Sequence, residues 1–282
     1  MDIKSLLQED IKSFFPKRNF ETHKGDYGKI LLLCGSRGYT GAPYLASMGA
    51  LRTGAGLVYL GVPESIYPIM AKKLTEPVVI PLRDRNGMFA KKSVDAIRKI
   101  LTNMDAVLIG CGLGLSEDTE TVVKTVLDEF KGTVILDADG INAMKAHKDS
   151  LRGRIGQTVI TPHFGEFSRF IGFAPSDRIS SAVEVAKDLN VIVLLKGHET
   201  VITDGTTCYI NKTGNPGMAV GGSGDLLAGI ITSLTGQGIA PLEAAAVGAW
   251  LHGKAGDICA EEIGEYGMLP SDMLNVLPRL LK

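Results

Sequence analysis

The chain has 282 residues, of which 45% are hydrophobic and 22% are charged, a composition typical of a folded globular protein. Lys and Arg number 30 against 31 Asp and Glu, so charge gives no reason to expect binding to nucleic acid or to an anionic membrane. The four cysteines stand far apart in the sequence, which argues against disulfides and a zinc site. No apolar run approaches the roughly 20 residues of a membrane span, which argues against a membrane protein. Together these features predict a cytoplasmic protein.

Short apolar runs recur along the chain, and turn residues followed by helical patterns separate most of them. The runs are residues 30–33, 57–60, 106–109, 134–136, 158–160 and 191–195, and the helical patterns include 42–52, 117–130 and 182–189. Continuous apolar strands suit a parallel sheet that is covered on both faces. The alternation predicts a doubly wound α/β fold, with 1–282 as a single domain because no linker or repeat divides the chain.

The last third of the chain departs from this alternation. Residues 200–203 and 208–210 flank the turn Asp204-Gly205-Thr206, which predicts an antiparallel hairpin near the edge of the sheet. Helical patterns follow at 225–234 and 241–262, and Pro241 suits a first helical turn.

Polar and glycine residues come directly after the apolar runs. They are Gly35-Ser36, Gly110 to Gly114, Asp137, Thr161-Pro162-His163 and Lys196-Gly197-His198. In doubly wound sheets, ligands bind beyond the carboxyl ends of the strands. We therefore expect the functional site along this edge.

The segment Gly221-Gly222-Ser223-Gly224-Asp225 is the strongest candidate for an active centre. Free backbone N–H groups at a helix start can cradle a phosphate, and Asp225 can take a proton from a hydroxyl that attacks phosphorus. It is not a P-loop, because no Lys-Ser or Lys-Thr follows. The alternative is a flexible loop in which Asp225 only stabilises the helix N-terminus, and the segment alone does not separate the two interpretations.

Four further motifs each have two interpretations. Gly110 to Gly114 can be a phosphate or dinucleotide loop, or a tight turn from strand to helix. His163 can be a ligand-binding or a structural residue. The stretch 196–200 can bind a nucleotide, with Lys196 on a phosphate, or be a solvated turn. Asp137 and Asp139 can bind Mg²⁺ directly or through water, or cap the next helix, and we expect at least one of them to cap.

Together and in this order, the motifs resemble the ribokinase-like superfamily, and within it the ADP/ATP-dependent NAD(P)H-hydrate dehydratases. The resemblance covers roughly residues 20 to 275. The matching stretches are 23–28, 35–36, 39–42, 112–114, 136–139, 161–166, 195–197 and 215–225. Val220 stands where the family commonly has Thr and Cys111 where it commonly has Pro, and we expect neither to touch a residue with a chemical role.

The resemblance implies a ribokinase-like fold and a hydro-lyase that repairs hydrated NADH and NADPH (NADHX and NADPHX). The ring hydroxyl at C6 is phosphorylated with ADP or ATP, phosphate is eliminated, and NAD(P)H is restored. By the same resemblance, Asp225 is the base and the amides of Gly222, Ser223 and Gly224 stabilise the transferring phosphoryl group. The implied substrate-binding residues are Ala42, Gly112, Gly114, His163 and Asp225, and the implied ADP/ATP-binding residues are Lys196, Gly197, His198, Glu199, Thr200 and Gly224.

The resemblance also implies Mg²⁺ with the nucleotide, although the sequence does not identify the metal ligands. It implies a homotetramer and the free-standing form of the enzyme, without the epimerase domain that precedes it in some relatives. Likeness to stand-alone microbial members favours ADP as the donor. Two rival functions stay open: a ribokinase-like kinase for a vitamin precursor, and a non-catalytic nucleotide-binding module, which the pairing of an anion cradle with Asp225 disfavours.

Overall fold

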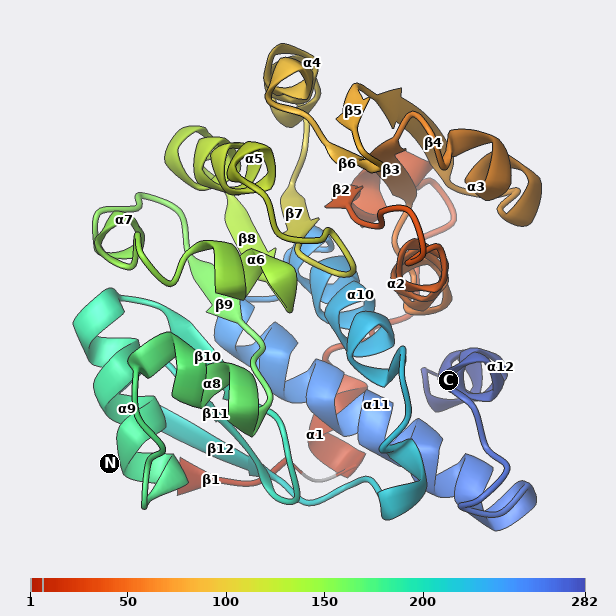
Figure 1. Ribbon diagram of the computed structural model, residues 1–282. Coiled ribbons are helices and arrows are strands. Elements are labelled where there is room, and N and C mark those ends of the chain that lie inside the picture. Colours follow the sequence, from red (N-terminus) through yellow and green to blue (C-terminus); the bar gives the residue numbers. More distant parts are fainter. Residues whose placement is uncertain (1, 7, 282) are drawn as a thin grey trace.

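The computed structural model describes residues 2–6 and 8–281 (Figure 1). Within these ranges one ten-stranded sheet crosses the molecule, and a two-stranded hairpin, β5 (Asp84–Arg85) with β6 (Met88–Phe89), stands apart. In order across the sheet, the strands are β1 (Asp2–Lys4), β12 (Thr207–Asn211), β11 (Thr200–Thr203), β10 (Ile192–Leu195), β9 (Thr158–Ile160), β8 (Thr133–Leu136), β7 (Ala106–Ile109), β2 (Lys29–Leu33), β3 (Leu57–Pro63) and β4 (Val78–Leu82).

The strand order is that of a doubly wound fold. From β2 the chain proceeds through β3 to β4 in one direction, and β7 to β12 then extend the sheet in the other. Among the described strands of the ten-stranded sheet, only β11 runs against its neighbours, β10 and β12. The mostly parallel sheet and the hairpin are therefore confirmed, and the switch in strand order lies between β2 and β7, where such folds place a ligand crevice.

All six apolar runs form strands, whereas β1, β4 and the β5–β6 hairpin were not predicted. The core explains why the predicted strands are apolar throughout. In β2, Leu31 and Leu33 pack on one face of the sheet, while Ile30 and Leu32 pack on the other. Both faces are thus covered, as a parallel sheet requires.

Helices form a layer on each face (Figure 1). One layer contains α4 (Val94–Leu101), α5 (Glu117–Glu129), α6 (Asp139–Ala143), α7 (Asp149–Arg152), α8 (Phe164–Ile171) and α9 (Arg178–Leu189). The other contains α2 (Gly41–Arg52), α3 (Tyr67–Lys73), α10 (Ser223–Gly236) and α11 (Pro241–Glu262). Outside α10 and α11 lie α12 (Pro270–Leu280) and α1 (Gln8–Ser13). Short 3-10 turns complete the chain: η1 (Lys24–Tyr27), η2 (Lys91–Ser93) and η3 (Pro216–Met218). None of the described helices is long and apolar enough to cross a membrane.

The position of α10 is determined by its close packing against α2. A Cβ atom added at Gly229 of α10 would lie 2.1 Å from the carbonyl oxygen of Ala46, and one added at Gly49 of α2 would lie 2.8 Å from that of Leu226. Real Cβ atoms do not approach so closely, so glycine at these positions allows the two helices to touch. This contact holds the start of α10, the glycine-rich segment, beside the carboxyl ends of the central strands.

Candidate active site

The start of α10 has the geometry of an anion cradle. Gly222 is the N-cap and has φ 95°, a left-handed conformation that favours glycine. Within the described chain, the N–H groups of Gly222, Gly224 and Asp225 have no protein acceptor, whereas the N–H of Ser223, which the resemblance also assigns to the phosphoryl group, donates to the carbonyl oxygen of Val220 at 3.3 Å. Unpaired N–H groups and the positive end of the helix dipole together attract an anion such as a phosphate.

Asp225 lies in the first turn of α10, close to two side chains that follow strands of the sheet. The Sγ of Cys111, after β7, a carboxylate oxygen of Asp137, after β8, and one of Asp225 all lie within 4.8 Å of one another. Burial raises the pKa of Asp225 to about 7, the Asp137 charge adds to the rise, and the Cys111 thiol and Lys196 partly oppose it. A carboxyl group with this pKa is half-ionised near neutral pH, which suits a general base.

Lys196 joins this cluster to the cradle. Its Nζ lies 3.0 Å from Oδ1 of Asp137 and 4.0 Å from Oε2 of Glu166, and 3.1 Å from where a Cβ of Gly224 would be. Burial alone would lower the pKa of Lys196, but the negative charges of Asp137 and Glu166 outweigh it and raise the pKa above its usual value. The ammonium group is therefore charged and stands beside the helix start, so Lys196 is not a solvated side chain, whereas residues 197–199 are exposed.

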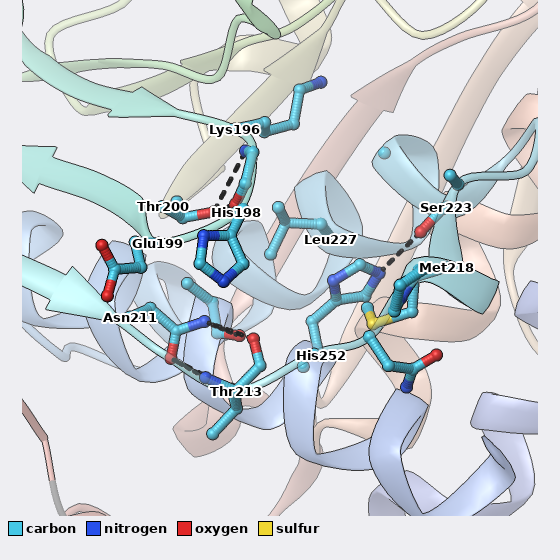
Figure 2. Close-up of a pocket in the computed structure, with 18 of the residues that line it drawn as sticks. Lys196, His198, Glu199, Thr200, Asn211, Thr213, Met218, Ser223, Leu227 and His252 are labelled. Atoms are coloured by element: carbon cyan, nitrogen blue, oxygen red, sulfur yellow. Dashed lines mark hydrogen bonds between the residues drawn. The ribbon is translucent and has the colours of Figure 1, made fainter. Parts of the chain in front are cut away.

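A cavity of about 640 Å³ opens on the β10–β11 side of the cradle (Figure 2). Ser223 and His163 line it. So do all six residues that the resemblance assigns to ADP or ATP, namely Lys196, Gly197, His198, Glu199, Thr200 and Gly224. The opposite wall comes from α11 and from the segment that precedes α10. Residues from four separate parts of the chain thus converge on one space of nucleotide size.

The residues implied for the hydrated dinucleotide lie mostly outside this cavity. A Cβ at Gly112 would lie 3.1 Å from the Cβ of Ala42, so these two residues adjoin each other. Gly114 donates its N–H to Asp139 Oδ2 at 2.8 Å. Ala42, Gly112 and Gly114 are outside the lining of the 640 Å³ cavity, whereas His163 is part of it. The cavity therefore contains the residues implied for ADP or ATP but only His163 of the residues named here for the dinucleotide, and Asp225 contacts Cys111 and directly follows Gly224 in the chain.

Two expectations from the sequence were wrong. The N-cap of α6 is Ala138, with no side-chain cap bond; Asp139 instead accepts from Gly114, and Asp137 accepts from Thr161 Oγ1 at 2.7 Å and from Lys196. Neither aspartate caps the helix, because both carboxylates have partners across the sheet edge.

Cys111 also differs from expectation. It is fully buried and contacts Asp137 and Asp225, and a hydrogen bond with the Cys34 thiol, together with burial, raises the pKa of its thiol well above the usual value.

His163 has a structural role in addition to its place in the cavity. Its Nδ1 accepts hydrogen bonds from the N–H groups of Gly165 and Glu166, so it caps α8. Glu166 in turn accepts from the His163 N–H, which completes a capping box. The backbones of His163 and Lys196, which follow β9 and β10, also form an isolated parallel β-bridge. The pairing of these two strands thus continues into the site.

Sequence reasoning missed several residues of the cavity, of which His252 on α11 is the clearest. Figure 2 shows its ring reaching the Ser223 hydroxyl, with Nε2 3.2 Å from Oγ. Burial lowers the pKa of His252 to about 4, so the ring is neutral at neutral pH. Asn211 and Met218 also line the cavity. A polar residue within the small, apolar residues of α11 is the signal that could have identified His252.

The chain has clear relatives in sequence and in fold. A family model described as NAD(P)H-hydrate dehydratase matches residues 30–279. The bifunctional NAD(P)H-hydrate repair enzyme of Moorella thermoacetica is 41% identical over 96% of this chain and 52% of its own length, so the chain spans about half of that relative. The ADP-dependent (S)-NAD(P)H-hydrate dehydratase of Cenarchaeum symbiosum is 33% identical over 100% of this chain and 98% of its own.

Solved structures agree with these sequence matches. The ADP/ATP-dependent NAD(P)H-hydrate dehydratase of Bacillus subtilis, co-crystallised with ATP/Mg²⁺, has a TM-score of 0.81 and 31% identity and covers 99% of this chain and 98% of that one. A ribokinase-like superfamily protein of Enterococcus faecalis has a TM-score of 0.86 and 25% identity, with 99% and 95% covered.

Proposed function

Because the chain belongs to the NAD(P)H-hydrate dehydratase family, we propose that it restores NADH or NADPH from the hydrated cofactor at the expense of ADP or ATP. The observation that carries this proposal is Asp225, a carboxylate of raised pKa in the first turn of a helix whose N–H groups are unpaired. A proton acceptor next to an anion cradle is the arrangement that phosphoryl transfer to a hydroxyl needs.

In the proposed reaction, the nucleotide occupies the cavity and its terminal phosphoryl group lies at the start of α10. The hydrated nicotinamide lies on the side of Ala42 and Gly112. Asp225 takes the proton of the C6 hydroxyl as its oxygen attacks phosphorus, and the N–H groups of Gly222 and Gly224 bind the charge that develops. Lys196, oriented by Asp137, balances the charge of the phosphates.

The second half of the reaction uses the phosphate as a leaving group. A hydroxyl leaves poorly, whereas a phosphate leaves readily. The lone pair of the ring nitrogen forms a double bond to C6 as the C6–O bond breaks, and loss of the C5 proton then gives the C5=C6 bond of NAD(P)H. The products are NAD(P)H, phosphate and the shortened nucleotide. The chain contributes alignment of the two ligands and exclusion of water.

The donor atoms near Asp225 fit a magnesium ion in part. Mg²⁺ prefers oxygen ligands and commonly binds through phosphates with one or two carboxylates. Asp137 and Asp225 can supply such oxygens, whereas the Cys111 thiol is a poor ligand for this ion. When bound with the nucleotide, the ion would neutralise phosphate charge.

The proposal is tested by adding the protein to hydrated NADH with Mg²⁺ and either ADP or ATP. We expect the near-ultraviolet absorbance of NADH to recover with at least one donor, together with release of phosphate. No recovery with either donor contradicts the proposal. A stable phosphorylated product would instead support the vitamin-precursor type of kinase, since the kinase step would then not lead to elimination.

We further propose a cytoplasmic location and a homotetramer. All four cysteines are free thiols, which fits a reducing compartment. The homotetramer rests on the resemblance to the family alone. Sedimentation of the purified protein tests it, and a monomer at micromolar concentration contradicts it.

A further inference from the structure

The loop that follows β10 forms one wall of the cavity and has an unusual backbone. Gly197 has φ 152°, and Glu199 has φ 54°, a left-handed conformation that is unfavourable for a residue with a side chain. Within the loop, Thr200 Oγ1 bonds the N–H and the carbonyl of Gly197. These local bonds do not involve the carbonyls of residues 195, 196 and 198.

Arg178, the first residue of α9, satisfies all three of those carbonyls. Its Nη1 donates to the carbonyl oxygen of His198 at 2.7 Å, and its Nη2 donates to those of Leu195 at 3.2 Å and Lys196 at 3.3 Å. Glycine at position 197 makes room for this contact, because a Cβ there would lie 2.8 Å from Nη2. In the described part of the chain, the guanidinium has no carboxylate partner, so its positive charge stays behind the loop.

This contact determines where the opposite side of the loop points. In a trans peptide, the carbonyl of one residue and the N–H of the next point in opposite directions. The carbonyl of His198 points to Arg178, so the N–H of Glu199 points away from it. Both His198 and Glu199 line the cavity, and neither of their N–H groups has an acceptor among the described residues. Donation from a cation to the carbonyl also polarises the peptide and strengthens its N–H as a donor.

We infer that Arg178 is a positioning residue for the nucleotide: it holds the carbonyls of the loop on its own side, above all that of His198, so that the N–H of Glu199 faces the nucleotide in the cavity. Arg178 itself is not part of the cavity lining. The inference rests on the proposed use of ADP or ATP. It means that Arg178, a residue outside the site, controls the affinity for the nucleotide.

The test compares nucleotide binding, by titration calorimetry with ADP and with ATP, in the parent protein, Arg178→Met and Arg178→Lys. Methionine keeps an unbranched apolar stem and loses every donor, whereas lysine keeps the charge but cannot reach three carbonyls with a fork. We expect Kd to rise by about tenfold or more in Arg178→Met and by less in Arg178→Lys. The KM for the hydrated cofactor should stay unchanged while the KM for the nucleotide rises.

Arg152→Met is the matched control. Arg152 on α7 also donates to a backbone carbonyl, that of Asp188 at 2.9 Å, and pairs with the Asp188 carboxylate, but its hydrogen bonds do not reach the loop after β10. We expect the nucleotide Kd of this variant to equal that of the parent. Hydrogen exchange supplies a second readout: ADP or ATP should protect the amides of His198 and Glu199 in the parent and protect them less in Arg178→Met.

The outcomes separate this inference from the proposed function. A parent protein that binds neither ADP nor ATP contradicts the proposed function. If the parent binds nucleotide and both Arg178 variants bind it equally well, the inference is overturned. If Arg178→Met does not fold, the lysine variant decides: an unchanged Kd and unchanged amide protection overturn the inference, and weaker binding with a parent-like melting temperature supports it.

Discussion

Replacing Asp225 by asparagine should abolish turnover and at the same time stabilise the protein at neutral and alkaline pH. The side chain keeps its size, but it can neither ionise nor accept the substrate proton. Loss of a general base typically lowers the rate by about 10²- to 10⁴-fold. If Asp225 only stabilised the start of α10, its removal would instead lower stability by about 0.3–1 kcal/mol.

The size of the stabilisation follows from the raised pKa. The difference between the ordinary 3.8 and about 7 corresponds to about 4 kcal/mol, since each pKa unit is worth about 1.4 kcal/mol. Asp225 is half-buried, so water reduces this value, and we expect about 2 kcal/mol. The folded state binds the proton more tightly than the unfolded state, so the parent loses stability as pH rises from about 4 to about 7. The asparagine variant does not incur this loss.

Urea unfolding of the parent and Asp225→Asn at pH 5 and pH 8, beside the NADH-recovery assay, measures both effects. The variant should be more stable than the parent at pH 8, and the difference should shrink at pH 5. Glu117→Gln is the control, an exposed acid in the first turn of α5 that we expect to change stability only slightly and activity not at all. A variant that is less stable than the parent at pH 8 would refute the argument from burial, and retained turnover would refute the role as base.

Three further predictions concern the surroundings of Asp225. Lys196→Met leaves the Asp137 carboxylate, which is 2% exposed, without its cation and should lower the free energy of unfolding by about 3–5 kcal/mol. Adding Asp137→Asn to the same chain should recover part of this loss. A double-mutant cycle measured by urea unfolding would contradict the ion pair if it showed no coupling between the two positions. Gly229→Ala places a methyl group against Ala46 and should lower the free energy of unfolding by about 1–3 kcal/mol, and an unchanged melting temperature would contradict the close helix contact. As pH falls from 6.5 to 4, His252→Gln should lose less stability than the parent. In the parent, the unfolded state gains a proton on His252 in this range, whereas the folded state, in which the pKa of His252 is about 4, does not. Equal slopes of the free energy of unfolding against pH would contradict the burial of a neutral ring.

Much of the fold could be predicted because its signals are local. The runs that became β2, β7, β8, β9 and β10 are apolar without interruption, and such segments are stable only when buried on both faces. The missed strands lack that signal. Strand β4 contains Pro81 and has Val78 46% exposed at the edge of the sheet, and β1 has only three residues whose pairing depends on the presence of β12.

The sequence by itself determined that a glycine-rich segment begins a helix next to Asp225, and that polar residues follow the strands. Which of these residues meet was decided only by the tertiary structure. Asp137 and Lys196 are 59 positions apart yet bonded at 3.0 Å, and Cys111 turned out to contact Asp225. The raised pKa of Asp225, the neutral ring of His252 and the contacts of Arg178 with the loop after β10 all depend on distance and on exclusion of water, which neighbouring residues in the chain do not encode.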